Sequence, residues 1–468
     1  MAKLTKEQKI QREIKKREKQ LAAPKSRLYL PWLLFVMSII YITDEVASQI
    51  STLMKTEIAN DMLAKFGQSS VGVLDLLTMV SVPFMALSVL YKPLADKYGR
   101  KPFLILNTFG MCLGLLVVYL SNNIAFYVAG VCITQFFTPH DMQAVYILES
   151  TPEKHRAKIY FTIKSIAQLG VMFVPLLRKA FMHNTSEWRN VYLLPALIGI
   201  GISVISIFLT KETDAFNKAR VNFLKGNTQE NGTDKSGGVI NALKFVWKHK
   251  QLRWLYAALT FAEISFVLQI NYEVIMSYGY AKFLMAKDGL TDINAALEIV
   301  SVNEITTALF MFPVGCAIGQ FFSGYISDFL NRKATALIMS ISSVLLLVGF
   351  SIGASKGLNP YLVGFLAGAC VGTFWSDIDT IMMMVGESSP TSLRSSILAA
   401  VYIATGLGIG ISYGVSIPIT TIFGNEHVST IALCLAVPGL TAAFLILAFK
   451  TKDTKGIDMN TVKGDEFD

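Results

Sequence analysis

The chain has 468 residues, of which 53% are hydrophobic and only 16% are charged, and its formal net charge is +9. A soluble domain carries about 25% charged residues, so this composition excludes an ordinary soluble protein. The basic excess is accounted for by membrane topology and requires no nucleic-acid partner.

The N-terminal segment 1–27, MAKLTKEQKIQREIKKREKQLAAPKSR, is basic and contains no apolar core. A cleaved signal peptide needs such a core. We therefore expect this segment to form a solvated, partly helical cytoplasmic arm, with binding to an anionic membrane surface as the alternative.

Twelve apolar stretches follow, and each is long enough to cross a hydrocarbon core of about 30 Å as a helix. They lie at residues 28–50, 71–92, 102–121, 125–148, 159–181, 190–210, 253–275, 303–327, 334–354, 361–386, 395–421 and 429–450, and are numbered here as spans 1 to 12. They predict an all-α polytopic membrane protein whose main partner is the lipid bilayer.

Most of the 42 Lys and Arg residues fall outside the spans on the side that holds both termini. Basic segments are retained on the cytoplasmic side, so we expect both termini in the cytoplasm and the protein in the plasma membrane. All five cysteines lie inside spans, which indicates neither a disulfide framework nor a metal site.

Ionisable residues inside spans are candidates for function, because their insertion costs about 2.5–3.5 kcal/mol near the helix centre. Spans 1, 4 and 5 contribute Asp44, Glu45, Asp141, Lys164 and Gln168. Asp44 or Glu45 is the predicted proton-responsive group. Two adjacent carboxylates repel each other, and this repulsion makes at least one of them easier to protonate. For Lys164 we expect a carboxylate partner, either Asp141 or one of Asp44 and Glu45; a side chain that extends to the membrane surface is the alternative.

Spans 7 and 10 add the candidates Glu263, Gln269, Asn271, Trp375, Asp377 and Asp379. Asp141 precedes Glu149 by eight residues, and Asp379 precedes Glu387 by eight. The two aspartates are therefore expected to face one central cavity as symmetry mates. The excess of carboxylates argues against a large anionic substrate and favours a coupling proton or sodium ion, a polar neutral solute or an organic cation.

Three polar strings each occur once in either half of the chain, in the same order and at the ends of equivalent spans. They are LADKYGRK (94–101) with ISDFLNRK (326–333), ESTPEKHRAKI (149–159) with ESSPTSLRSSI (387–397), and TKETD (210–214) with TKDTK (451–455). The repeats predict two pseudo-symmetric six-helix bundles, at residues 28–210 and 253–450. A cytoplasmic linker (211–252) joins them, and a cytoplasmic tail (451–468) follows.

On these strings the chain resembles the major facilitator superfamily of secondary transporters, whose loop between spans 2 and 3 reads Gly-x-x-x-Asp-Arg/Lys-x-Gly-Arg-Arg/Lys. The first copy supplies Asp96, Gly99, Arg100 and Lys101, but has Lys92 at the first glycine. The second supplies Gly324, Asp328, Arg332 and Lys333. There Asn331 replaces the turn glycine, and we expect Asn331 to adopt a left-handed backbone conformation.

The second string resembles Glu-x-x-Pro-x-x-x-Arg, which is strongest among sugar porters, and TKDTKGID resembles their ending Pro-Glu-Thr-Lys-Gly. Carboxylates beside arginines and helix N-termini form charge-assisted hydrogen bonds. We expect two such networks, one of Asp96, Arg100, Glu149 and Arg156 and one of Asp328, Arg332, Glu387 and Arg394. The resemblance implies that they hold the cytoplasmic side shut in the outward-facing state; the alternative is that basic loops only enforce topology.

The sequence therefore predicts a transporter that acts by alternating access, as a monomer, on a small polar solute. Proton- or sodium-coupled symport of a sugar-like substrate is the leading hypothesis, and proton-coupled efflux of drugs or organic cations is the alternative. A transporter-like sensor would need a longer tail or a signalling domain. Neither an enzyme nor a cofactor is indicated, because no nucleophile–base set appears. The glycine-rich GLGIGISYG (406–414) is expected to serve helix packing or bending.

Overall fold

The computed structural model describes residues 5–23, 27–63, 65, 70–138, 140–182, 185–226, 238–300, 304–423, 427–459 and 462. Within these residues the regular structure is helical throughout, with no strand, which confirms the predicted fold class. In the part of the chain that the structure describes, ten helices are long and apolar enough to cross a membrane. Spans 4 and 5 complete the predicted twelve, because each is built from two shorter helices.

In the N-terminal half (the N-half), span 1 is α2 (Tyr29–Leu53), span 3 is α7 (Arg100–Tyr119) and span 6 is α12 (Asn190–Leu209). Span 4 consists of α8 (Ile124–Phe136) and α9 (His140–Ser150), and span 5 of α10 (Arg156–Gly170) and α11 (Phe173–Phe181). Span 2 is the most interrupted: it comprises α4 (Ser70–Thr78), α5 (Ser81–Leu87), the 3-10 turns η2 (Ser88–Leu90) and η3 (Lys92–Leu94), and α6 (Ala95–Tyr98). The short α3 (Lys55–Met62) follows span 1.

In the C-terminal half (the C-half), span 7 consists of α15 (Lys250–Glu263), η6 (Ile264–Phe266) and α16 (Val267–Asp288). Spans 8 to 12 are α18 (Thr306–Phe329), α19 (Arg332–Ser355), α20 (Pro360–Glu387), α21 (Arg394–Phe423) and α22 (Val428–Lys450), with α17 (Ile293–Val300) before them. Span 7 runs farther than the sequence predicts. Its helix ends only where Gly289 adopts the left-handed conformation of a C-cap, with φ of 71°.

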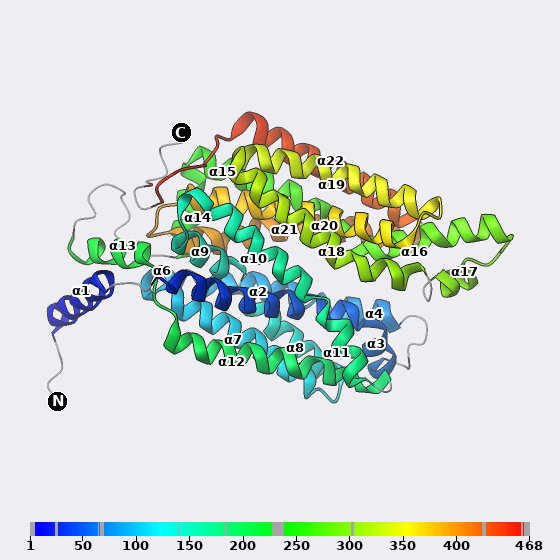
Figure 1. Ribbon diagram of the computed structural model, residues 1–468, viewed down its shortest axis with the longest axis horizontal. Helices are drawn as coiled ribbons and strands as arrows, with labels where there is room; N and C mark the ends of the chain where they lie inside the picture. The colour runs from blue at the N-terminus through cyan, green and yellow to red at the C-terminus, as the bar shows by residue number, and fades with distance from the viewer. Residues whose placement is uncertain are drawn as a thin grey trace.

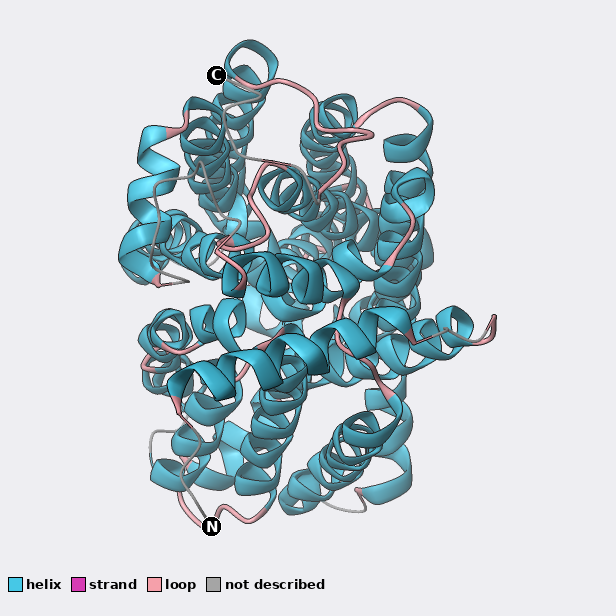
Figure 2. Cartoon of the chain, turned by 90° about the vertical axis from the view of Figure 1, so that its left-hand side faces the viewer, coloured by secondary structure: helices cyan, strands magenta, loops and turns pink. Residues whose placement is uncertain are grey.

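The two halves lie side by side, and both termini emerge at the same end of the bundle (Figure 1). We call this the terminal end; α3, α11 and α17 lie at the opposite end (Figure 1). Viewed onto the terminal end, the N-terminus and the C-terminus lie at opposite edges of the face (Figure 2). Two seams join the halves: α10 packs on α18, and span 2 packs on α21.

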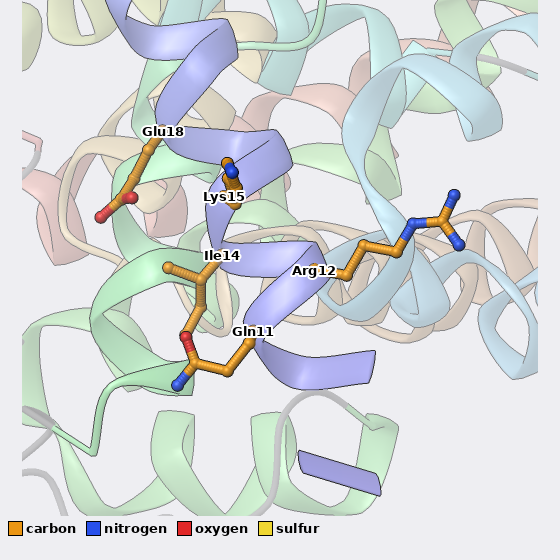
Figure 3. A pocket seen from close by; sticks show the side chains of 5 residues that line it. All are labelled: Gln11, Arg12, Ile14, Lys15 and Glu18. Carbon is orange, nitrogen blue, oxygen red and sulfur yellow. The ribbon is translucent and has the colours of Figure 1, made fainter. Parts of the chain in front are cut away.

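The predicted basic arm is a helix, α1 (Lys6–Ala22), and it is docked rather than free in solvent. It packs against α13 (Asp214–Leu224), where Arg17 Nη1 donates to Asn217 at 3.0 Å and Arg220 Nε donates to Glu13 at 3.0 Å. Five α1 side chains line an open surface hollow of about 550 Å³ (Figure 3). The predicted linker likewise holds α13 and α14 (Val239–Lys248); its low-complexity stretch lies largely outside the described residues.

Glycines bring α18 and α20 into direct backbone contact. Gly364, Gly368 and Gly372 are spaced four residues apart on α20, and a Cβ at any of them would overlap a backbone carbonyl of α18. Such small-residue contacts drive helix association in a membrane, where apolar burial between helices gives little. The predicted packing role of residues 406–414 is only partly met: Gly408 lies against Thr260, whereas Gly406, Gly410 and Gly414 face open space.

Replacing Gly368 by valine should lower the melting temperature of the purified protein by several degrees. The added carbon atoms would overlap the Phe312 carbonyl oxygen, and overpacking of this kind typically costs about 1–3 kcal/mol. Gly410→Val, at an exposed position on α21, is the matched control in the same thermal-unfolding assay. Equal melting temperatures for the two variants would show that the α18–α20 contact is not tight.

Candidate functional site

A cluster of buried ionisable side chains lies between the halves. Lys164 of α10 is 3.2 Å from Asp379 of α20 and 3.8 Å from Glu45 of α2, measured from Nζ to the nearest carboxylate oxygen. The three side chains are almost completely shielded from solvent. Lys164 and Asp379 each lie eight residues from the terminal end of their helix, which corresponds to about 12 Å of helix rise. The cluster is thus deep in the bundle, and Lys164 pairs there instead of extending to the surface.

The second acid of span 1 points elsewhere. Asp44 is fully buried, and its Oδ2 lies 2.9 Å from Nδ1 of His140, the first residue of α9. Adjacent residues of a helix point about 100° apart, so Asp44 meets span 4 while Glu45 meets span 5. His140 can adopt this position because span 4 is interrupted just before it.

Tyr160 belongs to this cluster, although the sequence analysis did not single it out. Its hydroxyl donates to Asp379 Oδ1 at 3.1 Å, and its ring packs edge-on against Tyr41. Tyr160 precedes Lys164 by one helical turn, and Gln168 follows by another, so all three share one face of α10. That spacing was the available signal. An aromatic residue in an apolar span is, however, usually a packing residue.

The remaining predicted residues that the structure describes lie around this cluster without forming ion pairs with it. Trp375 Nε1 donates to Gln269 at 3.1 Å, so spans 7 and 10 are joined near the cluster. Glu263 is buried where α15 ends and lies against Gly408 of α21. Gln168 is buried and Asn271 is partly exposed.

Asp377 does not join the central cluster, contrary to expectation. Ser340 of α19 donates to its Oδ2 at 2.6 Å, so Asp377 faces the interior of the C-half. Residues two apart on a helix point about 200° apart, so Asp377 and Asp379 cannot both face the N-half. The backbone of Asp141 is in α9, but its side chain lies outside the described residues, so its predicted symmetry with Asp379 stays a prediction. Among the described residues, no three His, Cys, Asp or Glu side chains form a possible metal site.

At the terminal end the predicted networks form within each half only in part: Arg100 and Arg332 pair as expected, whereas Arg156 and Arg394 do not. Arg100 pairs with Asp96 at 2.8 Å and with Glu149 at 3.3 Å. In the C-half, Arg332 pairs with Asp328 at 3.0 Å and with Glu387 at 3.3 Å. Both arginines are almost fully buried, so these are charge-assisted bonds in a low-dielectric site.

The same networks also join the two halves. Arg394 pairs with Glu149 at 2.8 Å, and Arg156 pairs with Glu387 at 3.2 Å. The prediction that each of these two arginines pairs within its own half is therefore wrong, because each reaches the glutamate of the opposite half.

The aspartates of the networks cross between the halves at helix N-termini. Asp96 accepts from the backbone N–H groups of Ser395 and Ser396 at the start of α21. Asp328 accepts from the backbone N–H of Lys158 at the start of α10. A carboxylate is favoured at a helix N-terminus, so each aspartate stabilises a helix of the other half.

Two further carboxylates complete the networks, and the sequence analysis missed their role. Glu212 accepts from the backbone N–H of Arg100, and Asp453 accepts from that of Lys333. These acids belong to the repeated strings TKETD and TKDTK. The threonine that follows each acid donates to the network glutamate at 2.6 Å, Thr213 to Glu149 and Thr454 to Glu387. Burial raises the pKa of Glu212, while the backbone hydrogen bonds that it accepts act in the opposite direction.

The turn inside the first repeated string differs between the two copies. Gly99 has φ of 124°, and a Cβ there would overlap the Glu212 carboxylate, so only glycine fits. Asn331 was expected to be left-handed, but its φ is −169°, which is extended. Its side chain instead accepts from the Ala334 N–H at 2.6 Å as an N-cap of α19.

The fold and the site define a polytopic transporter of two similar six-helix halves, with paired buried charges at one end and at the centre. The sequence profile of the Major Facilitator Superfamily matches residues 32–297, and the profile of the sugar (and other) transporter family matches residues 259–452. The chain belongs to the Major Facilitator Superfamily, whose members are transporters rather than enzymes.

Individual relatives are distant. The chain is 23% identical to alpha-ketoglutarate permease of Escherichia coli (strain K12) over 376 residues, which cover 76% of this chain and 75% of the permease. A segment of 146 residues is 33% identical to facilitated glucose transporter member 2 of solute carrier family 2 from Bos taurus, and covers 29% of this chain and 26% of that protein. The solved structure of the proton:xylose symporter XylE bound to 6-bromo-6-deoxy-D-glucose matches with a TM-score of 0.64 and 15% identity, over 93% of this chain and 98% of that chain. This structural likeness supports the fold alone.

Neutralising Lys164 should destabilise the protein strongly. Lys164→Met would leave Glu45 and Asp379 buried without their cation, and breaking a buried pair typically costs about 3–5 kcal/mol. Adding Asp379→Asn should restore part of the loss of melting temperature, because one of the two unpaired carboxylates is then removed. A double variant that is less stable than Lys164→Met would contradict the pairing.

Weakening the terminal network should slow transport. Asp96→Asn removes a charge that pairs with Arg100 and stabilises α21 across the halves, whereas the central cluster is untouched. We expect a several-fold lower transport rate in proteoliposomes, with expression and substrate affinity mostly retained. Glu153→Gln, an exposed acid at the same end, is the control, and a wild-type rate for Asp96→Asn would show that the network has no functional role.

Proposed function

We propose that this transporter moves a small polar solute by alternating access, in symport with protons or sodium ions. The observation that carries the proposal is the buried ion pair between Lys164 of the N-half and Asp379 of the C-half. In this family architecture, substrate sites lie between the halves near the midplane. A cation shared by acids of both halves is therefore suitably placed to sense their separation.

The pair suggests how ion binding could act on conformation. A buried ammonium group is stable only beside its carboxylates. Protonation of Asp379 or Glu45, or binding of a sodium ion between them, weakens the attraction to Lys164. Tyr160 can hydrogen-bond a protonated Asp379, so the neutral acid keeps one partner until the halves separate.

Asp44 with His140 is the second candidate for a proton site. The two groups lie 2.9 Å apart, and the carboxylate is fully buried. A proton can be shared or held between imidazole and carboxylate, and histidine titrates near neutral pH. Within span 1, the proton-responsive role is therefore proposed for Asp44, with Glu45 as the structural partner of Lys164.

The substrate is proposed to be sugar-like. Gln269 and Trp375 offer an amide beside an indole ring, which suits hydroxyl groups on an apolar ring face. The sugar transporter profile covers this half, and the symporter of similar fold was solved with a hexose analogue. A dicarboxylate would need several cations, and among the described residues the central cluster has one lysine and one histidine.

The bonds that cross between the halves at the terminal end favour an outward-facing state, if that end is cytoplasmic as the distribution of Lys and Arg indicates. A thermal-shift screen of the purified protein against sugars, organic acids and organic cations tests the substrate class. Stabilisation by organic cations alone would favour the efflux alternative.

Neutralising Asp44 should separate coupling from binding. Asp44→Asn is expected to abolish accumulation of substrate against a gradient, because no proton can be carried, and to spare exchange between equilibrated compartments. Proteoliposome assays of both modes across a pH series provide the measurement. Glu273→Gln, an exposed acid of α16, is the control.

Glu45→Gln distinguishes the neighbouring acid. We expect it to lower stability through Lys164 while retaining the pH profile of accumulation. If Asp44→Asn and Glu45→Gln both concentrate substrate with the wild-type pH profile, the coupling site does not lie on span 1, and Asp379 and then Glu263 are the next candidates.

A further inference from the structure

The two seams between the halves occupy equivalent places in the repeat but are built differently. Gly324 begins the motif of span 8 and faces α10, whereas Lys92 begins the equivalent motif of span 2 and faces α21. The α10–α18 seam is visible at the centre of the bundle (Figure 1). The chain thus has glycine in one seam and a buried lysine in the other.

Gly324 brings α18 against the backbone of α10. A Cβ at this position would lie 2.8 Å from the Phe161 Cβ, 3.1 Å from the Ala157 carbonyl oxygen and 3.2 Å from the Lys158 Cα. This seam also holds a cation–ring contact, because Lys158 Nζ of α10 lies 4.1 Å from the ring centroid of Tyr325 on α18. Tyr325 is exposed to solvent, so this contact is not desolvated and contributes little to closure.

Lys92 makes a different contact. The residue is fully buried, and its Nζ donates to the Thr138 carbonyl at 2.7 Å, within the N-half. The same Nζ lies 4.6 Å from the ring centroid of Tyr402, on α21 of the C-half. Thr138 lies in the interruption between α8 and α9, two residues before His140. Lys92 therefore connects the break that positions His140 with the opposite half.

We propose that Lys92 is a positioning residue that latches span 2 to span 11 through Tyr402, so that the terminal end opens at this seam while the α10–α18 seam serves as the pivot. The proposal rests on alternating access, as proposed above, but on no particular substrate or ion. A desolvated cation is held strongly by an aromatic face, and an ammonium group is readily hydrated once that face moves away. The contact thus favours closure without making opening prohibitive.

The test compares variants that keep or remove the cation–ring contact. Tyr402→Phe keeps the aromatic ring and Lys92→Arg keeps the cation. Tyr402→Leu removes the ring, and Lys92→Met removes the cation. Lys211→Met is the control, because Lys211 is an exposed lysine that lies over Tyr29 within the N-half. Melting temperatures identify any variant that fails to fold.

Electron–electron distance measurements in nanodiscs then report each seam separately. The labels are introduced in a Cys434→Ser background, because Cys434 is an exposed free thiol. Spin labels at Lys97→Cys and Ser392→Cys, both exposed, flank the span 2–span 11 seam, and labels at Lys154→Cys and Phe329→Cys flank the α10–α18 seam. No substrate is needed, so the result is independent of whether the proposed solute or coupling ion is correct.

We expect Tyr402→Leu and Lys92→Met to increase the long-distance population at the first pair at least threefold, with the second pair unchanged. Tyr402→Phe, Lys92→Arg and Lys211→Met should match the wild-type protein. If Tyr402→Leu does not fold, the comparison of Lys92→Met with Lys92→Arg tests the proposal by the same distance measurement. Unchanged distances at the first pair, equal widening at both pairs, or loss of closure in Tyr402→Phe would overturn the proposal.

Discussion

A charge buried in an apolar bundle must find its partners inside the protein, and most of this structure's polar organisation follows from that constraint. Moving an ion out of water costs several kcal/mol even after the protein relaxes. Arg100, Arg332 and Arg394 are all fully buried, and each is surrounded by carboxylates or carbonyl oxygens. The polar strings are therefore structural units, each of which supplies both the charge and its partners.

The constraint also explains why the strings occur at helix ends. The first N–H groups of a helix lack partners within it, and at the terminal end they are met by acids: Asp96, Asp328, Glu212 and Asp453. Two of these acids serve helices of their own half, and two serve helices of the opposite half. The same type of bond therefore stabilises each bundle and closes the interface between them.

Much of this could be predicted from the sequence. The twelve spans follow from apolar length, and the repeated strings correctly bring Arg100 to Glu149 and Arg332 to Glu387. The interruptions in spans 4 and 5 were not predicted, because the hydropathy of an apolar stretch is the same whether its helix is continuous or broken.

Interhalf contacts were the hardest to predict. The partners of Lys164 were expected within the N-half, and Glu45 is one of them, but Asp379 belongs to span 10 of the other half. Hydropathy cannot specify which faces of two bundles meet. Asp377 and Asp379 illustrate this limit, since both are acids of one span and helix rotation alone sends them to different neighbours.

In the proposed mechanism, the centre and the terminal networks are connected through two rigid helices. α10 carries both Lys164 and Arg156, and α20 carries both Asp379 and Glu387. Each helix thus makes one interhalf ion pair at the centre and one about 12 Å away at the terminal end. Loss of the central pair on protonation leaves the terminal pair as the remaining ion pair between α10 and α20, beside the Tyr160–Asp379 hydrogen bond. A shift of either helix that relieves the unpaired Lys164 must then strain the Arg156–Glu387 pair. A proton bound at the central cluster can therefore weaken closure at the terminal end through the rigid helices α10 and α20 alone.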